Sequence, residues 1–159
     1  MKTVNPTLEQ LDEFARTAPD DKPIVMLNLL KFRDVAEYGS RGPQGLTGRE
    51  AYKQYSKAVV PLVFEVGGQP LWMGDVRGSL IAPEGESWDE VILVHYPSRA
   101  AFVRMVRSNA YQAAMHHRTA ALLDSRLIET SAVRLPRFLL RAARSVTRAK
   151  SLLFPKIPR

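Results

Sequence analysis

The stretch that decides the fold runs from Val91 to Arg118 and reads VILVHYPSRAAFVRMVRSNAYQAAMHHR. Its first apolar residues predict a strand that ends near His95, and Ser98 is a favourable N-cap for the helix that follows. The polar run Ser108-Asn109-Ala110-Tyr111 predicts a kink before the helical pattern resumes. This unit carries all three histidines of the chain. We therefore expect it to supply one wall of any chemical site.

The rest of the chain supplies a complete α+β pattern around this unit. We expect a helix from Leu8, with Thr7 and Gln10 as a capping box, and then a strand over Pro23–Phe32 and a loop over Asp34–Thr47. A helix from Gly48, bent at Pro61, leads to two strands over Gln69–Ile81 and Trp88–Tyr96. The helical pattern after Ser98 continues to Leu123, and a turn at Asp124-Ser125 leads to a short strand over Arg126–Val133. After the first helix, this order predicts a ferredoxin-like βαββαβ subunit, an antiparallel sheet with helices on one face.

The strand over Pro23–Phe32 is apolar on both faces. Ile24, Met26 and Leu30 alternate with Val25, Leu27 and Leu29. A strand with this pattern is covered on both sides, yet the chain supplies helices for one side of the sheet. An identical sheet is the simplest cover for the other side, so we expect a homodimer.

The net charge of +7 is concentrated at one end of the 159-residue chain. All 16 acidic residues lie at or before Glu129, whereas eight of the 23 basic residues follow Val133. The division suggests a body over residues 1–133 and a basic tail over residues 134–159. The absence of cysteine excludes disulfides and thiolate chemistry. The start of the sequence lacks an apolar signal region, so we expect a cytoplasmic protein.

The tail has the pattern of an amphipathic helix that begins at Pro136. Apolar residues follow helical spacing beside a stripe formed by Arg137, Arg141, Arg144 and Arg148. Such a helix suggests peripheral attachment to an anionic membrane surface. The alternative is a helix that packs on the body or on the dimer partner. Nucleic-acid binding ranks third, because it gives the apolar face no role.

Short motifs along the body resemble one known family. They are Leu27-Asn28-Leu29, Tyr52-Lys53-Gln54-Tyr55, Gly67-Gly68-Gln69, Gly74, His95-Tyr96-Pro97-Ser98, Ser108-Asn109-Ala110-Tyr111 and Arg118. Together they look like the DUF1330 group of dimeric α/β-barrel proteins, over roughly Ile24 to Thr130. The resemblance implies a ferredoxin-like subunit whose sheet pairs with a second copy to form a barrel, with a cleft between sheet and helices. It implies no settled activity, since the wider class includes cofactor-free monooxygenases, haem-handling enzymes and isomerase-like proteins.

Six residues are the candidates for the site in this cleft. The catalytic candidates are His95 and Arg118. His95 is either a general base or a structural histidine. Arg118 either binds a carboxylate with two hydrogen bonds or forms a salt bridge with Asp124 or Glu129. The expected substrate-binding residues are Asn28, Tyr52, Trp72 and Tyr111. Asn28 points into the cleft or is tied to a neighbouring loop. The aromatic residues line an apolar pocket or belong to the core.

A metal site and a cofactor are not expected. His116 and His117 are adjacent on a helix, where side chains diverge by about 100 degrees, so they are poorly placed to chelate one metal. No phosphate-binding or dinucleotide-binding glycine motif occurs. We expect a protein that binds or transforms a small apolar or carboxylated molecule, with a cofactor-independent monooxygenase-like or isomerase-like activity if it is an enzyme. The alternative is a non-catalytic dimeric module held at a membrane or partner by its tail.

Overall fold

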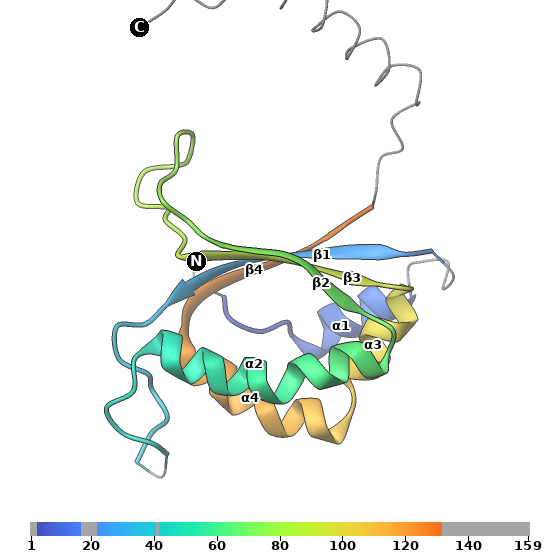
Figure 1. The fold of residues 1–159 in the computed structure, drawn as a ribbon, viewed down its shortest axis with the longest axis horizontal. Coiled ribbons are helices and arrows are strands. Elements are labelled where there is room, and N and C mark those ends of the chain that lie inside the picture. Colours follow the sequence, from blue (N-terminus) through green and yellow to red (C-terminus); the bar gives the residue numbers. More distant parts are fainter. Residues whose placement is uncertain (1–2, 17–21, 41, 132–159) are drawn as a thin grey trace, which may run out of the picture.

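The computed structural model describes residues 3–16, 22–40 and 42–131. Along the chain the elements are α1 (Leu8–Arg16), β1 (Ile24–Phe32), α2 (Gly48–Glu65), β2 (Gln69–Asp75), β3 (Glu90–Tyr96), α3 (Arg99–Val106), α4 (Asn109–Ala121) and β4 (Leu122–Thr130), shown in Figure 1. The expected tail helix with its four arginines lies outside the described residues. Within them, no helix is long and apolar enough to cross a membrane.

The four strands form one antiparallel sheet in the order β2-β3-β1-β4. The two strands nearest in sequence, β2 and β3, form a hairpin, and β1 lies between β3 and β4. With the helices on one face (Figure 1), this is the ferredoxin-like α+β arrangement, so the predicted fold is confirmed. In the single chain the sheet is open and does not close into a barrel.

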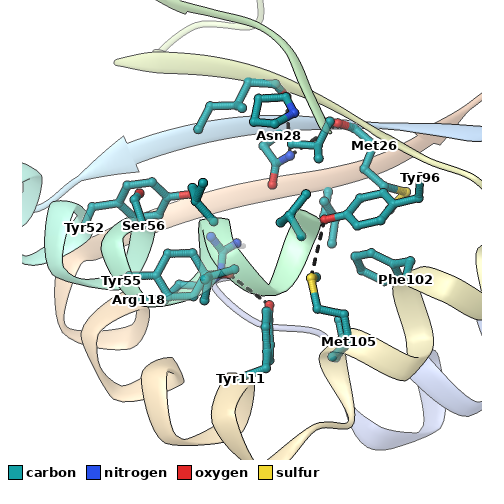
Figure 2. A pocket seen from close by; sticks show the side chains of 18 of the residues that line it. Met26, Asn28, Tyr52, Tyr55, Ser56, Tyr96, Phe102, Met105, Tyr111 and Arg118 are labelled. Atoms are coloured by element: carbon teal, nitrogen blue, oxygen red, sulfur yellow. Dashed lines mark hydrogen bonds between the residues drawn. The ribbon is translucent and has the colours of Figure 1, made fainter. Parts of the chain in front are cut away.

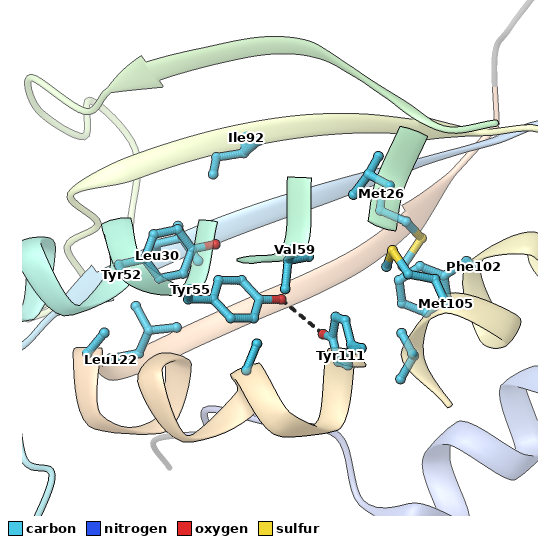
Figure 3. Packing of buried hydrophobic residues seen from close by; sticks show 14 of the residues in the cluster. Met26, Leu30, Tyr52, Tyr55, Val59, Ile92, Phe102, Met105, Tyr111 and Leu122 are labelled. Carbon is cyan, nitrogen blue, oxygen red and sulfur yellow. Dashed lines mark hydrogen bonds between the residues drawn. The ribbon is translucent and has the colours of Figure 1, made fainter. Parts of the chain in front are cut away.

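The core lies between the sheet and the helices, as Figure 3 shows. One face of β1 contributes Met26 and Leu30, which pack against the buried stripe of α2 that includes Tyr55 and Val59. Leu30 and Leu122 are the largest fully buried side chains among the described residues. The alternation in β1 therefore separates a buried inner face from an outer face.

The outer face of the sheet is apolar and has no cover in the single chain. Here β1 places Leu27 between Leu93 of β3 and Ile128 of β4, and Trp72 of β2 pairs with Leu93. The side chains of Trp72 and Ile128 are 53% and 45% exposed. The structure thus confirms that β1 is apolar on both faces and shows that the helices cover one of them.

Side-chain caps fix where the helices begin. The Thr7 amide donates to Gln10 Oε1 at 2.9 Å and the Gln10 amide to Thr7 Oγ1 at 3.1 Å, so the predicted capping box is confirmed. Ser98 caps α3 as predicted. Ser108 caps α4, so the expected kink is a complete break between two helices.

The predicted strand over Gln69–Ile81 is too long, since β2 ends at Asp75. The reason lies at Asp89, whose carboxylate accepts from the Phe32 amide at 2.7 Å and from Lys31 Nζ at 2.9 Å. These contacts hold Asp89 against β1. The 14 residues from Val76 to Asp89 then form a loop that extends beyond the sheet, with Leu80 and Ile81 almost fully exposed.

The predicted turn at Asp124-Ser125 is also wrong. The helix α4 passes directly into β4 at Leu122, which is extended and fully buried. The polar pair is accommodated inside the strand because the N-terminal segment binds it. Asp124 Oδ1 accepts from the Thr3 amide at 2.8 Å, and the Ser125 amide donates to the Thr3 carbonyl at 2.7 Å.

Candidate functional site

A cavity of about 120 Å³ lies between the inner face of the sheet and helices α2, α3 and α4. Figure 2 shows the side chains that project into it from both layers. Most of its wall is apolar or aromatic, including Met26, Ile92, Val59, Phe102 and Met105. Its polar groups come from Asn28, Tyr52, Tyr55, Ser56, Tyr96, Tyr111 and Arg118. A mainly apolar wall with a few convergent polar groups is typical of small-molecule sites.

Tyrosines from two helices form the aromatic wall of the cavity. Tyr52 and Tyr55 of α2 have ring centroids 5.2 Å apart, and the Tyr55 hydroxyl donates to the Tyr111 hydroxyl of α4 at 3.0 Å. Burial raises the pKa of Tyr52 to about 12, an effect that the nearby Arg118 charge partly opposes. Burial likewise raises the pKa of Tyr55 well above its ordinary value. Tyr52 and Tyr55 therefore stay neutral hydrogen-bonding groups at ordinary pH.

Arg118 is the cationic group of the cavity. It reaches the cavity from α4 and is 4% exposed. Its guanidinium lies 5.8 Å from the centre of the Tyr55 ring, and Nη2 donates to the Val4 carbonyl at 3.2 Å and to Ser125 Oγ at 3.0 Å. These acceptors are neutral. Among the described residues, no carboxylate lies within ion-pair distance of Arg118.

The salt bridge considered for Arg118 is therefore absent from the described structure. Asp124 pairs instead with Arg126, at 2.6 Å, and Glu129 pairs with Arg99. The geometry follows from β4. Asp124 lies opposite Lys31 of β1 on the outer face of the sheet, whereas Arg118 lies on the helix side. Glu129 lies opposite Met26 on the helix side, but its carboxylate is taken by Arg99.

Asn28 presents its carboxamide to the same cavity from the middle of β1. Its Nδ2 donates to the backbone carbonyls of Met26 and Ile92, both at 3.3 Å. These two bonds fix the orientation of the amide, and Figure 2 shows the Asn28 oxygen facing the cavity. The side chain is thus both tied to neighbouring backbone and available as an acceptor.

His95 and Trp72 do not line this cavity. The alternation of β3 places Tyr96 in the cavity wall and His95 on the outer face, opposite Val25 of β1. Trp72 also lies on the outer face. The structure therefore brings together Asn28, Tyr52, Tyr111 and Arg118, and it separates them by the thickness of the sheet from the other two candidates.

The two adjacent histidines form a separate cluster with Tyr38. Contrary to the expectation that they diverge, their ring centroids are 3.9 Å apart. His116 Nδ1 contacts the Ala113 carbonyl at 2.7 Å, and His117 Nδ1 contacts the Tyr38 hydroxyl at 2.6 Å. Burial and then the His116 charge lower the pKa of His117. The described residues contain no group of three or more side chains arranged to hold a metal ion.

Several residues of the cavity wall were not among the candidates. They are Tyr55, Ser56, Tyr96 and Phe102. The signal for Tyr96 was present, because it shares the inner face of β3 with Ile92. The signal for Tyr55 was its position three residues after Tyr52, which puts both rings on one side of α2.

Comparison with known proteins identifies relatives of this arrangement. Residues 45–130 match the family described as "Domain of unknown function (DUF1330)". A solved protein of unknown function from Rhodopseudomonas palustris, RPA0582, is 38% identical, with a TM-score of 0.77 over 85% of this chain and 100% of that one. The structure of methylated RPA0582 is 39% identical, with a TM-score of 0.77 over 84% of this chain and 96% of that one.

A dimeric protein of unknown function with a ferredoxin-like fold, from Bacteroides fragilis, is 11% identical, with a TM-score of 0.45 over 72% of this chain and 100% of that one. None of the curated proteins matches. The match over more than half of the chain, together with the identity to RPA0582, shows that the chain belongs to the DUF1330 family.

Proposed function

We propose that the protein binds a small, largely apolar carboxylic acid in the cavity between sheet and helices. The observation that carries this proposal is the buried guanidinium of Arg118, which borders an apolar cavity and has no carboxylate partner in the described structure. A buried cation is normally paired. An anionic ligand would supply the missing charge, and a planar guanidinium binds carboxylates with two parallel hydrogen bonds.

The size of the cavity sets the size of the ligand. An apolar cavity of roughly 150 Å³ holds one benzene molecule, and this cavity measures about 120 Å³. A short branched chain or a single ring would fill this space, with the acidic group at Arg118 on its wall. The Asn28 oxygen and the tyrosine hydroxyls would select a ligand that also carries a hydroxyl or amino group.

Binding accounts for the cavity wall better than acid–base catalysis does. The described residues of the cavity wall include no histidine, aspartate or glutamate. The pKa values of Tyr52 and Tyr55 lie above their ordinary range. His95, the expected general base, lies on the other side of the sheet. A general acid or base is most effective when its pKa lies near the working pH. The monooxygenase-like and isomerase-like activities thus find no proton-transfer residue in this wall.

A homodimer is the assembly that this proposal includes. The outer face of the sheet is apolar, with Trp72 and Ile128 half exposed in the single chain. A second copy placed sheet to sheet would cover these side chains and would complete the barrel that the family resemblance implies. His95 and Trp72 would then belong to the interface rather than to the ligand site.

The experiment is calorimetric titration of the protein with benzoate. We expect the wild-type protein to bind benzoate and to bind benzyl alcohol, which has no charge, much more weakly. Charged hydrogen bonds contribute about 1.5–3 kcal/mol, so Arg118→Gln is expected to weaken benzoate binding about 10- to 100-fold. Arg104→Gln is the matched control, because Arg104 is exposed on α3. Equal benzoate affinity of Arg118→Gln and Arg104→Gln, in folded proteins, would refute the proposal.

A further inference from the structure

The N-terminal residues 3–7, the N-terminal strap, already occupy one side of the Arg118 guanidinium. The Val4 carbonyl accepts from Arg118 Nη2 at 3.2 Å and from Ser125 Oγ at 2.8 Å, and Nη2 also donates to Ser125 Oγ at 3.0 Å. Both hydrogens of Nη2 are therefore engaged. A carboxylate binds a guanidinium either through both Nη atoms or through Nε and Nη2, so each bidentate geometry needs Nη2.

The strap is held in place mainly by hydrogen bonds at the surface. Thr3 binds Asp124 and Ser125 through its backbone, and Asn5 Nδ2 donates to Thr119 Oγ1 at 2.9 Å. Of its residues, Val4 alone is partly buried, and the others are exposed. Exposed hydrogen bonds exchange readily with water and contribute modestly. Releasing the strap thus costs little buried apolar surface.

A second cavity of about 490 Å³ lies behind the strap. The strap and α1 form one wall, and β4 forms another. It shares five lining residues with the first cavity, namely Pro6, Met26, Phe102, Arg118 and Leu127. Arg118 thus borders both cavities, and Pro6 of the strap lies beside the first. Movement of the strap would change access to the guanidinium from the second cavity.

We propose that the strap regulates the ligand site by competing for Arg118. In the empty protein the Val4 carbonyl takes the place of one carboxylate oxygen, and a bound acid displaces it. The inference rests on the proposed function, because it presumes a carboxylate ligand at Arg118. The exchange favours the ligand, since hydrogen bonds to a carboxylate are roughly twice as strong as those to a neutral carbonyl. The cost of releasing the strap lowers the affinity of the site.

The test uses variants of the full chain that loosen the strap without substituting any residue that lines the first cavity. Asp124→Ala removes the acceptor of the Thr3 amide, and Asn5→Ala removes the bond to Thr119. Each is expected to bind benzoate about 2- to 10-fold more tightly than wild type, the equivalent of one hydrogen bond. Thr130→Val, which removes a side-chain bond to Val25 at the far end of β4, is the control and is expected to bind like wild type.

Hydrogen exchange supplies the second readout. The Ser125 amide, which donates to the Thr3 carbonyl, is expected to exchange faster in the benzoate complex than in the free protein. The inference is overturned if benzoate binding depends on Arg118 but neither strap variant binds more tightly, or if Ser125 exchange is unchanged or slower in the complex. If no form of the protein binds benzoate, the proposed function itself fails. Benzoate binding by the strap variants but not by the wild-type protein would support both the proposed function and the regulation by the strap.

Discussion

Arg118 and its neighbours show how single residues of this protein depart from an ordinary core. A fully apolar core would place leucine or methionine where α4 meets the sheet, yet this chain places a guanidinium there that is 4% exposed. Its described acceptors are a backbone carbonyl and the hydroxyls of a serine and a tyrosine. Desolvating a cation costs several kcal/mol, and neutral acceptors offset this in part. An arginine held in this way is consistent with a role in binding an anion.

The buried tyrosines give a prediction about alkaline stability. The pKa of Tyr52 is about 12 in the folded protein against an ordinary 10.0, so between these values the folded chain holds a proton that the unfolded chain has released. Raising the pH through this interval therefore favours unfolding. We expect the free energy of unfolding, measured with urea, to fall from about pH 10 upward. The free energy of unfolding of Tyr52→Phe should fall less steeply with pH. An identical slope for both proteins would contradict the raised pKa of Tyr52.

At the scale of elements, sequence patterns located every described strand and helix but not all of their ends. The helix caps at Thr7 and Ser98 are local, so they were predictable. The end of β2 depends on Asp89 binding the backbone of β1, and the start of β4 depends on Thr3 binding Asp124 across 121 positions in sequence. Contacts between distant segments leave no periodic signal, which is why these two boundaries were wrong.

Gly48 gives a prediction about the junction between β1, α2 and β4. A Cβ at this position would lie 2.4 Å from the Arg33 carbonyl oxygen and 2.5 Å from that of Ala121. Both are backbone atoms and cannot move away independently. We expect Gly48→Ala to lower the free energy of unfolding by about 1–3 kcal/mol or more.

Gly78 is the matched control, because its Cβ would meet nothing within 4 Å and its φ is not positive. Thermal unfolding of the two variants measures the difference. A Gly48→Ala protein as stable as Gly78→Ala would show that the junction is looser than the structure indicates.

For the molecule as a whole, the sequence showed that the sheet has two apolar faces but not which face the helices cover. The pattern of β3 correctly grouped His95 with Val91 and Leu93. The side of the sheet on which this group lies depends on how the helices pack, and both faces of β1 are apolar. His95 and Trp72 were therefore assigned to the same cleft as Arg118.

A charge on the outer face of the sheet and a charge on the helix surface are expected to affect assembly differently. Ile128 is on the outer face of β4 and is 45% exposed, whereas Phe64 is on α2 and is 58% exposed. If a second copy covers the outer face, Ile128→Asp would bury a charge and shift the protein to monomers. Phe64→Asp would leave the dimer intact. Light scattering measures both masses, and a monomeric wild type or an unchanged Ile128→Asp dimer would count against the interface.

A crystal structure of the protein with benzoate would show whether the ligand binds at Arg118. We expect the ring in the cavity between Tyr55, Met26 and Phe102, with the carboxylate about 3 Å from the guanidinium nitrogens of Arg118. Benzoate bound away from Arg118, or a cavity that holds no benzoate at concentrations that saturate the protein in solution, would contradict the account.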